Sequence, residues 1–350
     1  MQKSLRRPGA RTAGSAIQAF DMLLREENEN REYEILSADA AKAAESRGRK
    51  RDEEKCVLRT DFQRDRDRII HSKALRRLMH KTQVFIAPEQ AHFRTRLTHT
   101  LEVAQIARSI ARALKLNEDL TEAIAMGHDL GHTPFGHSGE AALAAKHPGG
   151  FRHNVQSLRV CDVLEVNGER RGMNLTEEVR DGILHHTGSG RPFTLEGRIV
   201  KIADRIAYVN HDIDDALRSG IISEADLPRE PIEILGNTTG KRINALILDM
   251  VGSSDGTGDI SQTEVCSAAM NELRDFLFGA VYLSDHVAVD AERYEIGDVI
   301  NTLYDYYSIN PDKISSDFQA LIGEYGLAEI VKDQIAGMTD RYAREMYLGL

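Results

Sequence analysis

The stretch from Gly127 to Glu140, GHDLGHTPFGHSGE, decides how the rest of the chain must fold around it. Five of its residues can bind a metal or carry a proton, namely His128, Asp129, His132, His137 and Glu140. A protein interior accepts such groups only when each one is paired or bound to a cation. We therefore expect a metal-assisted hydrolytic site here, with packed helices around it that supply the missing ligands.

The sequence on both sides of this stretch has the periodicity of amphipathic helices. Alternating strand patterns are scarce, and the best case is a short hairpin near 82–94. The sequence therefore predicts an all-α fold with at most that hairpin. The predicted helices are 60–81, 97–116, 118–129, 137–146, 154–165, 176–186, 196–217, 263–278, 288–307, 315–323 and 327–348.

Changes in composition divide the chain into three parts. Residues 1–57 read as a peripheral N-terminal segment, in which 38–55 has almost no apolar face and is interpreted as a solvated helix or a flexible tether. Residues 58–250 form the predicted core. The Gly/Ser-rich run VGSSDGTGD marks the next boundary, so 251–350 is predicted to be a helical C-terminal region packed on the core.

Composition also limits the function classes. The net charge of -10 over 350 residues does not imply steering of nucleic acid by the whole molecule, although a local basic patch stays open. No run of about 18 apolar residues occurs, and the N-terminus lacks the apolar core of a signal peptide. Three cysteines without a CxxC pattern are typical of a reducing compartment. We therefore expect a cytoplasmic protein without a membrane partner.

Adjacent residues at the end of a predicted helix form the centre of the expected metal site. His128 and Asp129 can converge on one cation where the chain turns into Gly131. Two more ligands must come from other segments, and the candidates are His99 in RTRLTHT and Asp204 in the apolar stretch KIADRIAYVNHDIDDA. Imidazole with carboxylate favours Mn, Fe, Co, Ni or Zn, whereas Mg prefers more oxygen ligands.

The other groups of the stretch suit proton transfer and phosphate binding. His137 and Glu140 are three residues apart and share one face of a helix, so the carboxylate can orient the imidazole for proton transfer. His132 is expected to face the substrate, and Arg96 and His153 supply nearby positive charge. Since guanidinium groups match phosphate groups well, these residues indicate a substrate with several phosphates.

Several features have a structural reading beside the functional one. Six isolated histidines are interpreted as structural, namely His71, His80, His92, His147, His211 and His286. The pair His185 and His186 can either interact with a helix C-terminus or contact phosphate. The Arg/Asp-rich run 59–81 is read first as a salt-bridged helix, and a nucleic-acid or effector role remains open for it.

The order of the expected ligands resembles the pattern of the HD-domain phosphohydrolases. Five ordered motifs between about 59 and 217 resemble its deoxynucleoside triphosphate triphosphohydrolase branch, often labelled deoxyguanosinetriphosphate triphosphohydrolase-like. These motifs are RTDFQRDRDRIIHSKALRRLMHKTQVF, RTRLTHTLEVAQIAR, GHDLGHTPFGHSGE, GGFRHNVQSLRV and KIADRIAYVNHDIDDA. The resemblance implies an HD-domain helical core with peripheral N- and C-terminal helices, and hydrolysis of a dNTP to the deoxynucleoside and inorganic tripolyphosphate.

The resemblance also implies a role for each matched residue. It makes His99, His128, Asp129 and Asp204 the ligands of a divalent metal, and His137 with Glu140 the catalytic pair. Arg96, His132 and His153 would contact the triphosphate, Gln83 and Asp212 would read the 3′-hydroxyl, and Tyr208 would pack on the deoxyribose. The family further implies a homo-oligomer, a hexamer or a tetramer, with a dNTP effector and single-stranded DNA as additional partners in some members.

Two alternatives stay open at this stage. The first is a 5′-nucleotidase or phosphodiesterase built on the same HD scaffold. The second is a dNTP-sensing or single-stranded-DNA-binding protein in which hydrolysis is secondary. Neither the preferred base nor the metal, among Mn, Mg, Fe, Co, Ni and Zn, follows from the sequence.

Overall fold

The computed structural model describes residues 24–83, 94–282 and 290–350. These residues are predominantly helical, from α1 (Arg25–Ile35) to α17 (Asp340–Leu348). Among them the only sheet is a two-stranded antiparallel hairpin formed by β1 (Val166–Asn167) and β2 (Arg170–Arg171). The prediction of an all-α fold is confirmed.

The first half of the described chain contains the helices α2 (Asp61–Ile70), α3 (Lys73–Arg77), α4 (Arg96–Ala113), α5 (Glu118–Gly127), α6 (Gly136–Lys146), α7 (His153–Arg159), α8 (Glu177–His185) and α9 (Leu195–Arg218). The second half contains α10 (Arg229–Leu235), α11 (Thr239–Ser254), α12 (Glu264–Leu277), α13 (Asp290–Ile309), α14 (Ser316–Gln319), α15 (Ile322–Tyr325) and α16 (Leu327–Ala336).

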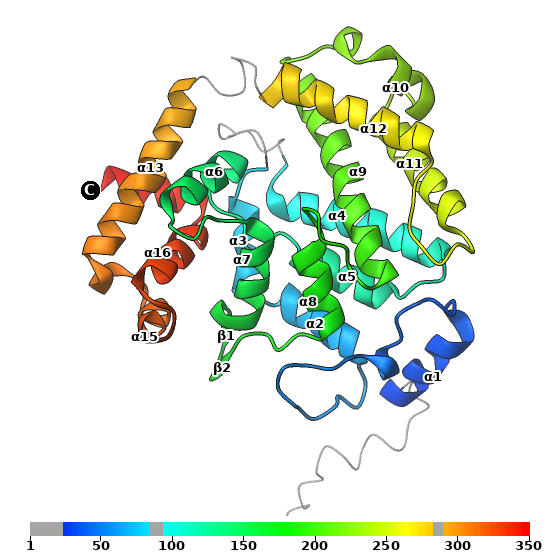
Figure 1. Ribbon diagram of the computed structural model, residues 1–350, viewed down its shortest axis with the longest axis horizontal. Coiled ribbons are helices and arrows are strands. Elements are labelled where there is room, and N and C mark those ends of the chain that lie inside the picture. The colour runs from blue at the N-terminus through cyan, green and yellow to red at the C-terminus, as the bar shows by residue number, and fades with distance from the viewer. Residues whose placement is uncertain (1–23, 84–93, 283–289) are drawn as a thin grey trace, which may run out of the picture.

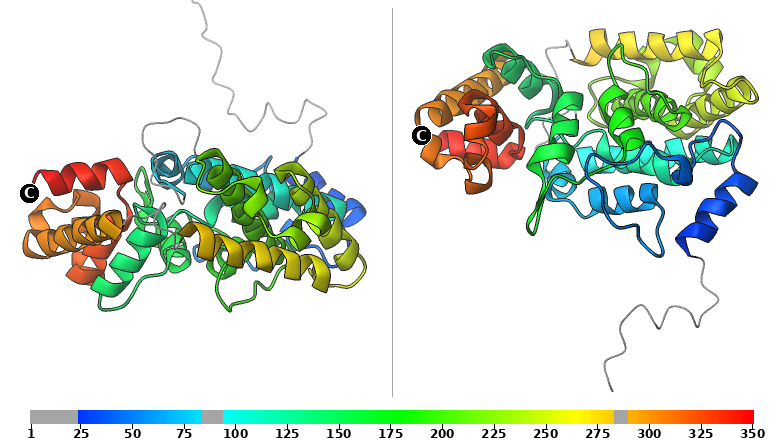
Figure 2. Two further views of the ribbon diagram at one scale, coloured as in Figure 1. Left: turned by 90° about the horizontal axis from the view of Figure 1, so that it is seen from above. Right: turned by 60° about the horizontal axis from the view of Figure 1, so that its bottom comes forward.

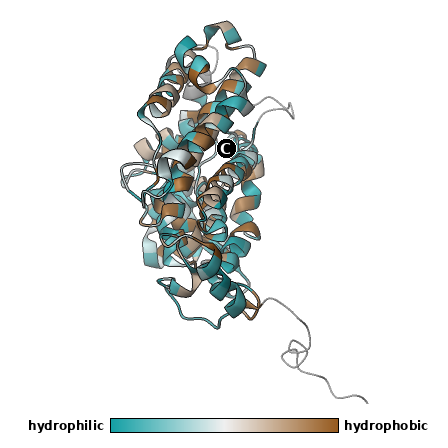
Figure 3. Ribbon diagram, turned by 90° about the vertical axis from the view of Figure 1, so that its right-hand side faces the viewer, coloured by the Kyte–Doolittle hydropathy of each residue, from teal (hydrophilic) through white to brown (hydrophobic). Residues whose placement is uncertain are grey.

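The central core is built from α2, α4, α5, α8 and α9, which pack against one another (Figure 1). The α9 helix contributes a row of fully buried apolar residues, Ile199, Val200, Ala203, Ile206 and Ala207. Most of the core helices turn an apolar face inward and a polar face outward, so hydrophobic and hydrophilic residues alternate along their ribbons (Figure 3). Burial of these faces is the main driving force for the arrangement.

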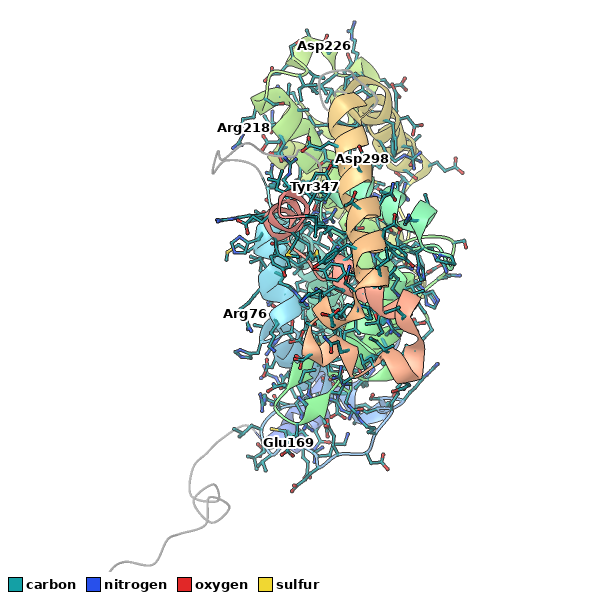
Figure 4. All side chains as sticks on the ribbon, turned by 90° about the vertical axis from the view of Figure 1, so that its left-hand side faces the viewer. Arg76, Glu169, Arg218, Asp226, Asp298 and Tyr347 are labelled. Atoms are coloured by element: carbon teal, nitrogen blue, oxygen red, sulfur yellow. The ribbon has the colours of Figure 1, made fainter. Side chains whose placement is uncertain are left out.

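Two outer groups of helices cover the core. The helices α10, α11 and α12 pack with α9 on one side. The helices α13 to α17 gather at the opposite end of the molecule beside α6 (Figures 1 and 2). There α17, which carries Tyr347, lies next to α13, which carries Asp298 (Figure 4). The helix α6, which carries the end of the His-rich stretch, and the following helix α7 therefore lie between the core and the C-terminal helices.

Side-chain caps fix the start of the helices that carry the site. Thr95 accepts the N–H of Thr98 at the start of α4, and Thr194 accepts the N–H of Gly197 at the start of α9. Asn117 caps α5 by accepting the N–H of Leu120 at 3.1 Å, as its position in the sequence predicts. Each cap satisfies an N–H that the helix itself leaves free.

The single helix predicted over 60–81 is wrong. Ser72 has an extended backbone and accepts the N–H of Leu75 through Oγ, so it ends α2 and begins α3. The chain then forms a 3-10 turn at Leu78–His80. Most of the predicted hairpin near 82–94 lies outside the described residues, but Thr82 and Thr95 at its ends form an antiparallel bridge.

The interpretation of 38–55 as a solvated helix or a flexible tether is also wrong. Its only helical turn is Ala43–Glu45, and the rest is irregular chain held on the core. Arg49 is the anchor, because its buried guanidinium pairs with the carboxylates of Asp61 and Asp65. A charge with two buried partners can enter the core without an apolar face. The proposed boundaries at 57 and 250 remain predictions.

Candidate metal centre

Four side chains from three elements meet at the centre of the fold. His99 lies in the first turn of α4, and Asp204 lies in the middle of α9. His128 and Asp129 follow directly after the last residue of α5, where the chain leaves the helix. The three ligand atoms of His99, His128 and Asp129 lie within 4.8 Å of one another.

Asp204 closes this arrangement from the side of α9. Its Oδ1 lies 3.0 Å from Nε2 of His99 and 3.7 Å from Nε2 of His128. Oδ1 of Asp129 lies 3.5 Å from the same His128 nitrogen. The structure thus brings together the four residues that the sequence singled out as ligands.

The hydrogen bonding of His128 tests whether these residues fit a cation. Its Nδ1 contacts the carbonyl oxygen of Ala125 at 2.6 Å, and a carbonyl only accepts, so Nδ1 carries the proton. Its Nε2 then presents a lone pair, is buried, and has no hydrogen-bond partner. A lone pair that faces two carboxylates in a protein interior is unfavourable unless a cation lies between them. The residues therefore fit a divalent metal ion.

Arg96 pairs with the carboxylate of Asp129, one of the expected ligands. Its guanidinium is buried and lies 2.9 Å from Oδ2 of Asp129, while Nε has no hydrogen-bond partner. Burial alone would raise the pKa of the Asp129 carboxyl, but His132, His128 and Arg96 lower it well below its usual range. Asp129 is thus held in its charged form, with the Oδ1 atom turned toward the histidines.

Two stacked imidazoles continue the site beyond Asp129. The rings of His132 and His153 lie 4.1 Å apart and nearly parallel. Burial and the charge of Arg96 lower the pKa of His132 well below its usual range. Burial also opposes protonation of His153, but a hydrogen bond to Glu140 raises its pKa. The pair therefore combines a neutral ring with one that favours the charged form.

Glu140, on α6, holds this charged ring. Its carboxylate accepts the backbone N–H of His153 at 2.8 Å and lies 3.0 Å from the ring Nδ1. His137 is a second partner, with Nδ1 at 3.5 Å and a side chain that is 66% exposed. Burial would raise the pKa of Glu140, but these two histidines lower it. One carboxylate thus orients two imidazoles.

Comparison with known proteins identifies two known domains and several relatives of this chain. Residues 96–209 match the HD domain family, and residues 260–348 match the phosphohydrolase-associated domain family. A deoxyguanosinetriphosphate triphosphohydrolase-like protein of Caldanaerobacter subterraneus subsp. tengcongensis is 57% identical over 93% of this chain and 95% of its own. Relatives with the same name from Desulfatibacillum aliphaticivorans and Clostridium tetani are 47% and 44% identical, over 93% and 92% of this chain and 97% and 94% of their own.

The chain belongs to the deoxyguanosinetriphosphate triphosphohydrolase-like family of HD-domain proteins. It is thus a phosphohydrolase of the HD class. The residues that match the HD domain include His128 and Asp129, which are called the HD pair below. Among the described residues, no helix is long and apolar enough to cross a membrane.

His186 is the residue of this HD site that the sequence did not settle. Its Nδ1 donates to the carbonyl of Ile183, so Nε2 is free to accept, and it lies 3.2 Å from Nε2 of His153. Burial and the neighbouring His128 lower the pKa of His186 to about 3, which keeps the ring neutral. Glu140, His153 and His186 therefore form a chain of hydrogen bonds. The adjacent His185 instead pairs with Asp181.

Glycine allows the HD loop to dock on α7. The N–H of Gly131 donates to Oγ of Ser157, and that hydroxyl donates to the carbonyl of His128. A Cβ atom on Gly131 would lie 2.1 Å from the backbone nitrogen of Ser157. Only glycine permits this approach, which places His128 and His153 on facing segments.

The residues expected to read the sugar lie next to the ligands. Tyr208 and Asp212 follow Asp204 at intervals of four residues on α9, so all three share a helix face. Tyr208 is half-buried and packs against the core, and Asp212 is buried. Gln83 is buried, its side-chain oxygen has no hydrogen-bond partner, and its carbonyl lies 3.4 Å from the guanidinium of Arg96.

A pocket of about 450 Å³ adjoins the outer end of this histidine chain. Glu140, His153 and His185 line it, and Arg152 brings positive charge to it. The space beside His153 is therefore open rather than filled by packed side chains.

Proposed function

We propose that the protein hydrolyses deoxynucleoside triphosphates to deoxynucleosides and inorganic tripolyphosphate. The observation that carries the proposal is a continuous run of side chains that are able to bind phosphate. Arg96 and His132 both contact Asp129, and His153 stacks on His132 and contacts Glu140. A run of this kind suits a chain of phosphates better than a single phosphate. The names of the relatives support the same substrate class.

The proposed metal ligands are His99, His128, Asp129 and Asp204, and the ion is Mn, Mg, Fe, Co, Ni or Zn. When bound, a divalent ion supplies positive charge that stabilises a phosphoryl group under attack. The side chain of Asp204 is 23% exposed, whereas that of His128 is 1% exposed, so the centre opens on the side of α9. Substrate would approach from that side.

The chain's own residues then perform three tasks. Arg96, His132 and His153 bind the triphosphate, and the positive charge on Arg96 and on a protonated His153 offsets the charge of the phosphates. Hydrolysis at the α-phosphorus breaks the bond to the 5′-oxygen, which needs a proton to depart as a hydroxyl. His137 is the exposed imidazole beside Glu140, and it is the proposed proton carrier for this step.

Selection of the sugar is proposed for three further residues. Tyr208 would pack on the deoxyribose and leave no room for a 2′-hydroxyl, which discriminates by exclusion. Gln83 and Asp212 would hydrogen-bond the 3′-hydroxyl. The buried Gln83 oxygen that has no partner supports this assignment, because a ligand hydroxyl would satisfy it.

Identification of the products tests the proposal most directly. The purified protein is incubated with each dNTP, singly and mixed, with Mn or Mg, and the phosphate products are separated. Tripolyphosphate with free deoxynucleoside is the expected result. Orthophosphate or pyrophosphate would instead favour the 5′-nucleotidase or phosphodiesterase alternative. In the same assay, His137→Ala is expected to bind nucleotide but release no tripolyphosphate.

The proposal extends to the assembly and its effectors. A homo-oligomer, either a hexamer or a tetramer, is expected by light scattering. Faster turnover of mixed dNTPs than of single ones would reveal a dNTP effector. Binding of single-stranded DNA with a steep dependence on salt would support the sensing or binding alternative, through the basic run 59–81.

A further inference from the structure

A carboxylate on the C-terminal helices contacts two segments at the edge of the site. Asp340 is the first residue of α17, within the segment that matches the phosphohydrolase-associated domain. Its Oδ2 accepts the backbone N–H of Thr82 at 3.0 Å and the hydroxyl of Thr82 at 2.7 Å. Its Oδ1 accepts the backbone N–H of Phe135 at 2.9 Å. Both oxygens are thus occupied by residues far away in the sequence.

The two segments that Asp340 joins are those that carry substrate-facing residues. Thr82 precedes Gln83, and Phe135 lies two residues before His137. They also touch each other, since a Cβ atom on Gly136 would lie 2.8 Å from the carbonyl oxygen of Gln83. Asp340 therefore holds both sides of a close backbone approach at the edge of the site.

Phe135 needs such a partner because its backbone is strained. Its φ angle is 62°, in the left-handed region that a phenylalanine rarely adopts. It is the N-cap residue of α6, and it directs the first turn of the helix, which carries His137. The ring of Phe135 is buried, and the guanidinium of Arg344, also on α17, lies 5.6 Å from its centre.

A second contact joins the same parts of the molecule. The buried ammonium group of Lys81 donates to the carbonyl of His132 and, at 2.7 Å, to the carbonyl of Ala336 at the end of α16. The backbone on both sides of the HD loop is therefore tied to the C-terminal helices, at His132 through Lys81 and at Phe135 through Asp340.

An aspartate in the first turn of a helix often serves only the helix itself. In α17 that task falls to the preceding residue, because Thr339 accepts the N–H of Tyr342. The carboxylate of Asp340 instead points to Thr82 and Phe135. Thr339 therefore stabilises the start of α17, whereas Asp340 contacts the segments at the edge of the site.

We propose that Asp340 is a positioning residue of the active site, which fixes Gln83 and His137 relative to each other through Thr82 and Phe135. The inference rests on the proposed function for the roles of Gln83 and His137. According to this inference, the C-terminal helices are required for catalysis and do not merely pack on the core.

The test uses Asp340→Asn with two control variants on the same helix. Asn keeps the size of the side chain but offers one acceptor oxygen instead of two. Thr339→Ala removes the cap of α17 without touching the site, and Glu345→Gln makes the same acid-to-amide change in an exposed pair with Arg341. Thermal unfolding and metal content are measured for every variant.

Two readouts separate positioning from stability. The first is hydrogen exchange of the Phe135 amide, which needs no substrate. The second is the ratio of kcat/KM for a dNTP to that for the matching 2′,3′-dideoxynucleoside triphosphate, which does not depend on the fraction of active enzyme. Asp340→Asn is expected to speed hydrogen exchange of the Phe135 amide and to lower kcat by about tenfold to a hundredfold. It should also reduce the preference for the dNTP over the dideoxynucleotide, because Gln83 is no longer held in place. Thr339→Ala and Glu345→Gln are expected to retain the wild-type ratio and kcat.

Wild-type amide protection, or a wild-type ratio and kcat, in Asp340→Asn would overturn the inference. The same loss of ratio in Thr339→Ala would overturn it as well. A wild-type protein that releases no tripolyphosphate would contradict the proposed function instead. In that case hydrogen exchange of the Phe135 amide still tests whether Asp340 holds the turn that precedes α6.

Discussion

The carboxylate of Glu140 lies closer to the imidazole of His153, at 3.0 Å, than to that of His137, at 3.5 Å. The acid that the sequence pairs with His137 is thus shared, and its stronger contact is with a ring on α7. Removal of its charge should therefore disturb both phosphate binding and proton transfer.

Glu140→Gln is expected to lower kcat by about a hundredfold to a thousandfold, because neither imidazole keeps a charged partner. Nucleotide affinity should fall less, since Arg96 and His132 remain in place. Steady-state kinetics and equilibrium binding measure the two effects separately. Glu169→Gln, an exposed change in the turn between β1 and β2, serves as control and should match the wild type. Full activity in Glu140→Gln would refute a role for the shared carboxylate.

Asp129→Ala should lose both the metal and a large part of the stability. It removes a proposed ligand and leaves the guanidinium of Arg96 buried without a charged partner. Breaking a buried pair in this way typically costs about 3–5 kcal/mol. Urea unfolding and elemental analysis provide the two measurements.

Asp204→Ala is the matched comparison for this change. Asp204 pairs with His99 and is partly exposed, so its loss should remove the metal with a smaller loss of stability. Metal content at the wild-type level in either variant would contradict the proposed ligand set.

Gly131→Ala should destabilise the loop on which the HD pair lies. The added Cβ would lie 2.1 Å from the nitrogen of Ser157 and 2.4 Å from the carbonyl carbon of Gln156, and neither backbone atom can move without α7. Metal affinity and activity should fall together. In Gly252→Ala the Cβ meets nothing within 4 Å inside α11, and the protein should gain about 0.5–1 kcal/mol. Equal effects of the two substitutions would show that the close approach at Gly131 does not matter.

Glu196 should make stability depend on pH. It is fully buried at the start of α9, where Oε1 accepts the backbone N–H groups of Ala41 and Asn117 and Oε2 has no partner. Burial raises the pKa of this carboxyl to about 7. Folding therefore favours the protonated form, and this stabilisation is present at low pH and is lost as the pH rises through about 7.

The measurement is urea unfolding at several pH values for the wild type and Glu196→Gln. From about pH 5 to about pH 8 the wild type should lose roughly 3 kcal/mol more than the variant. Parallel curves for the two proteins would mean that Glu196 titrates normally in the folded state.

Much of the centre could be predicted from the sequence because its chemistry is local. His128 and Asp129 are neighbours in the chain, and helix periodicity places Asp204 among residues that must be buried. A buried carboxylate beside histidines indicates a cation even before the fold is known. The N-cap at Asn117 followed from residue type alone.

Contacts between segments could not be predicted in the same way. The preference of Glu140 for His153 over His137 depends on how α6 and α7 dock, which no spacing in the sequence records. His186 joins the site only because its Nδ1 is held by the carbonyl of Ile183. Arg49 looked solvated because its buried partner Asp65 lies on another element.

The long α9 helix has a consequence for the evolution of the protein. It carries Asp204 on one face, and α11 and α12 pack against it. Because a helix moves largely as a rigid rod, a changed side chain in those outer helices would tilt the rod and shift Asp204 away from His99. A substitution in α11 or α12 that changes their packing on α9 is therefore expected to change metal affinity, although neither helix carries a proposed ligand, and compensating substitutions are expected in relatives.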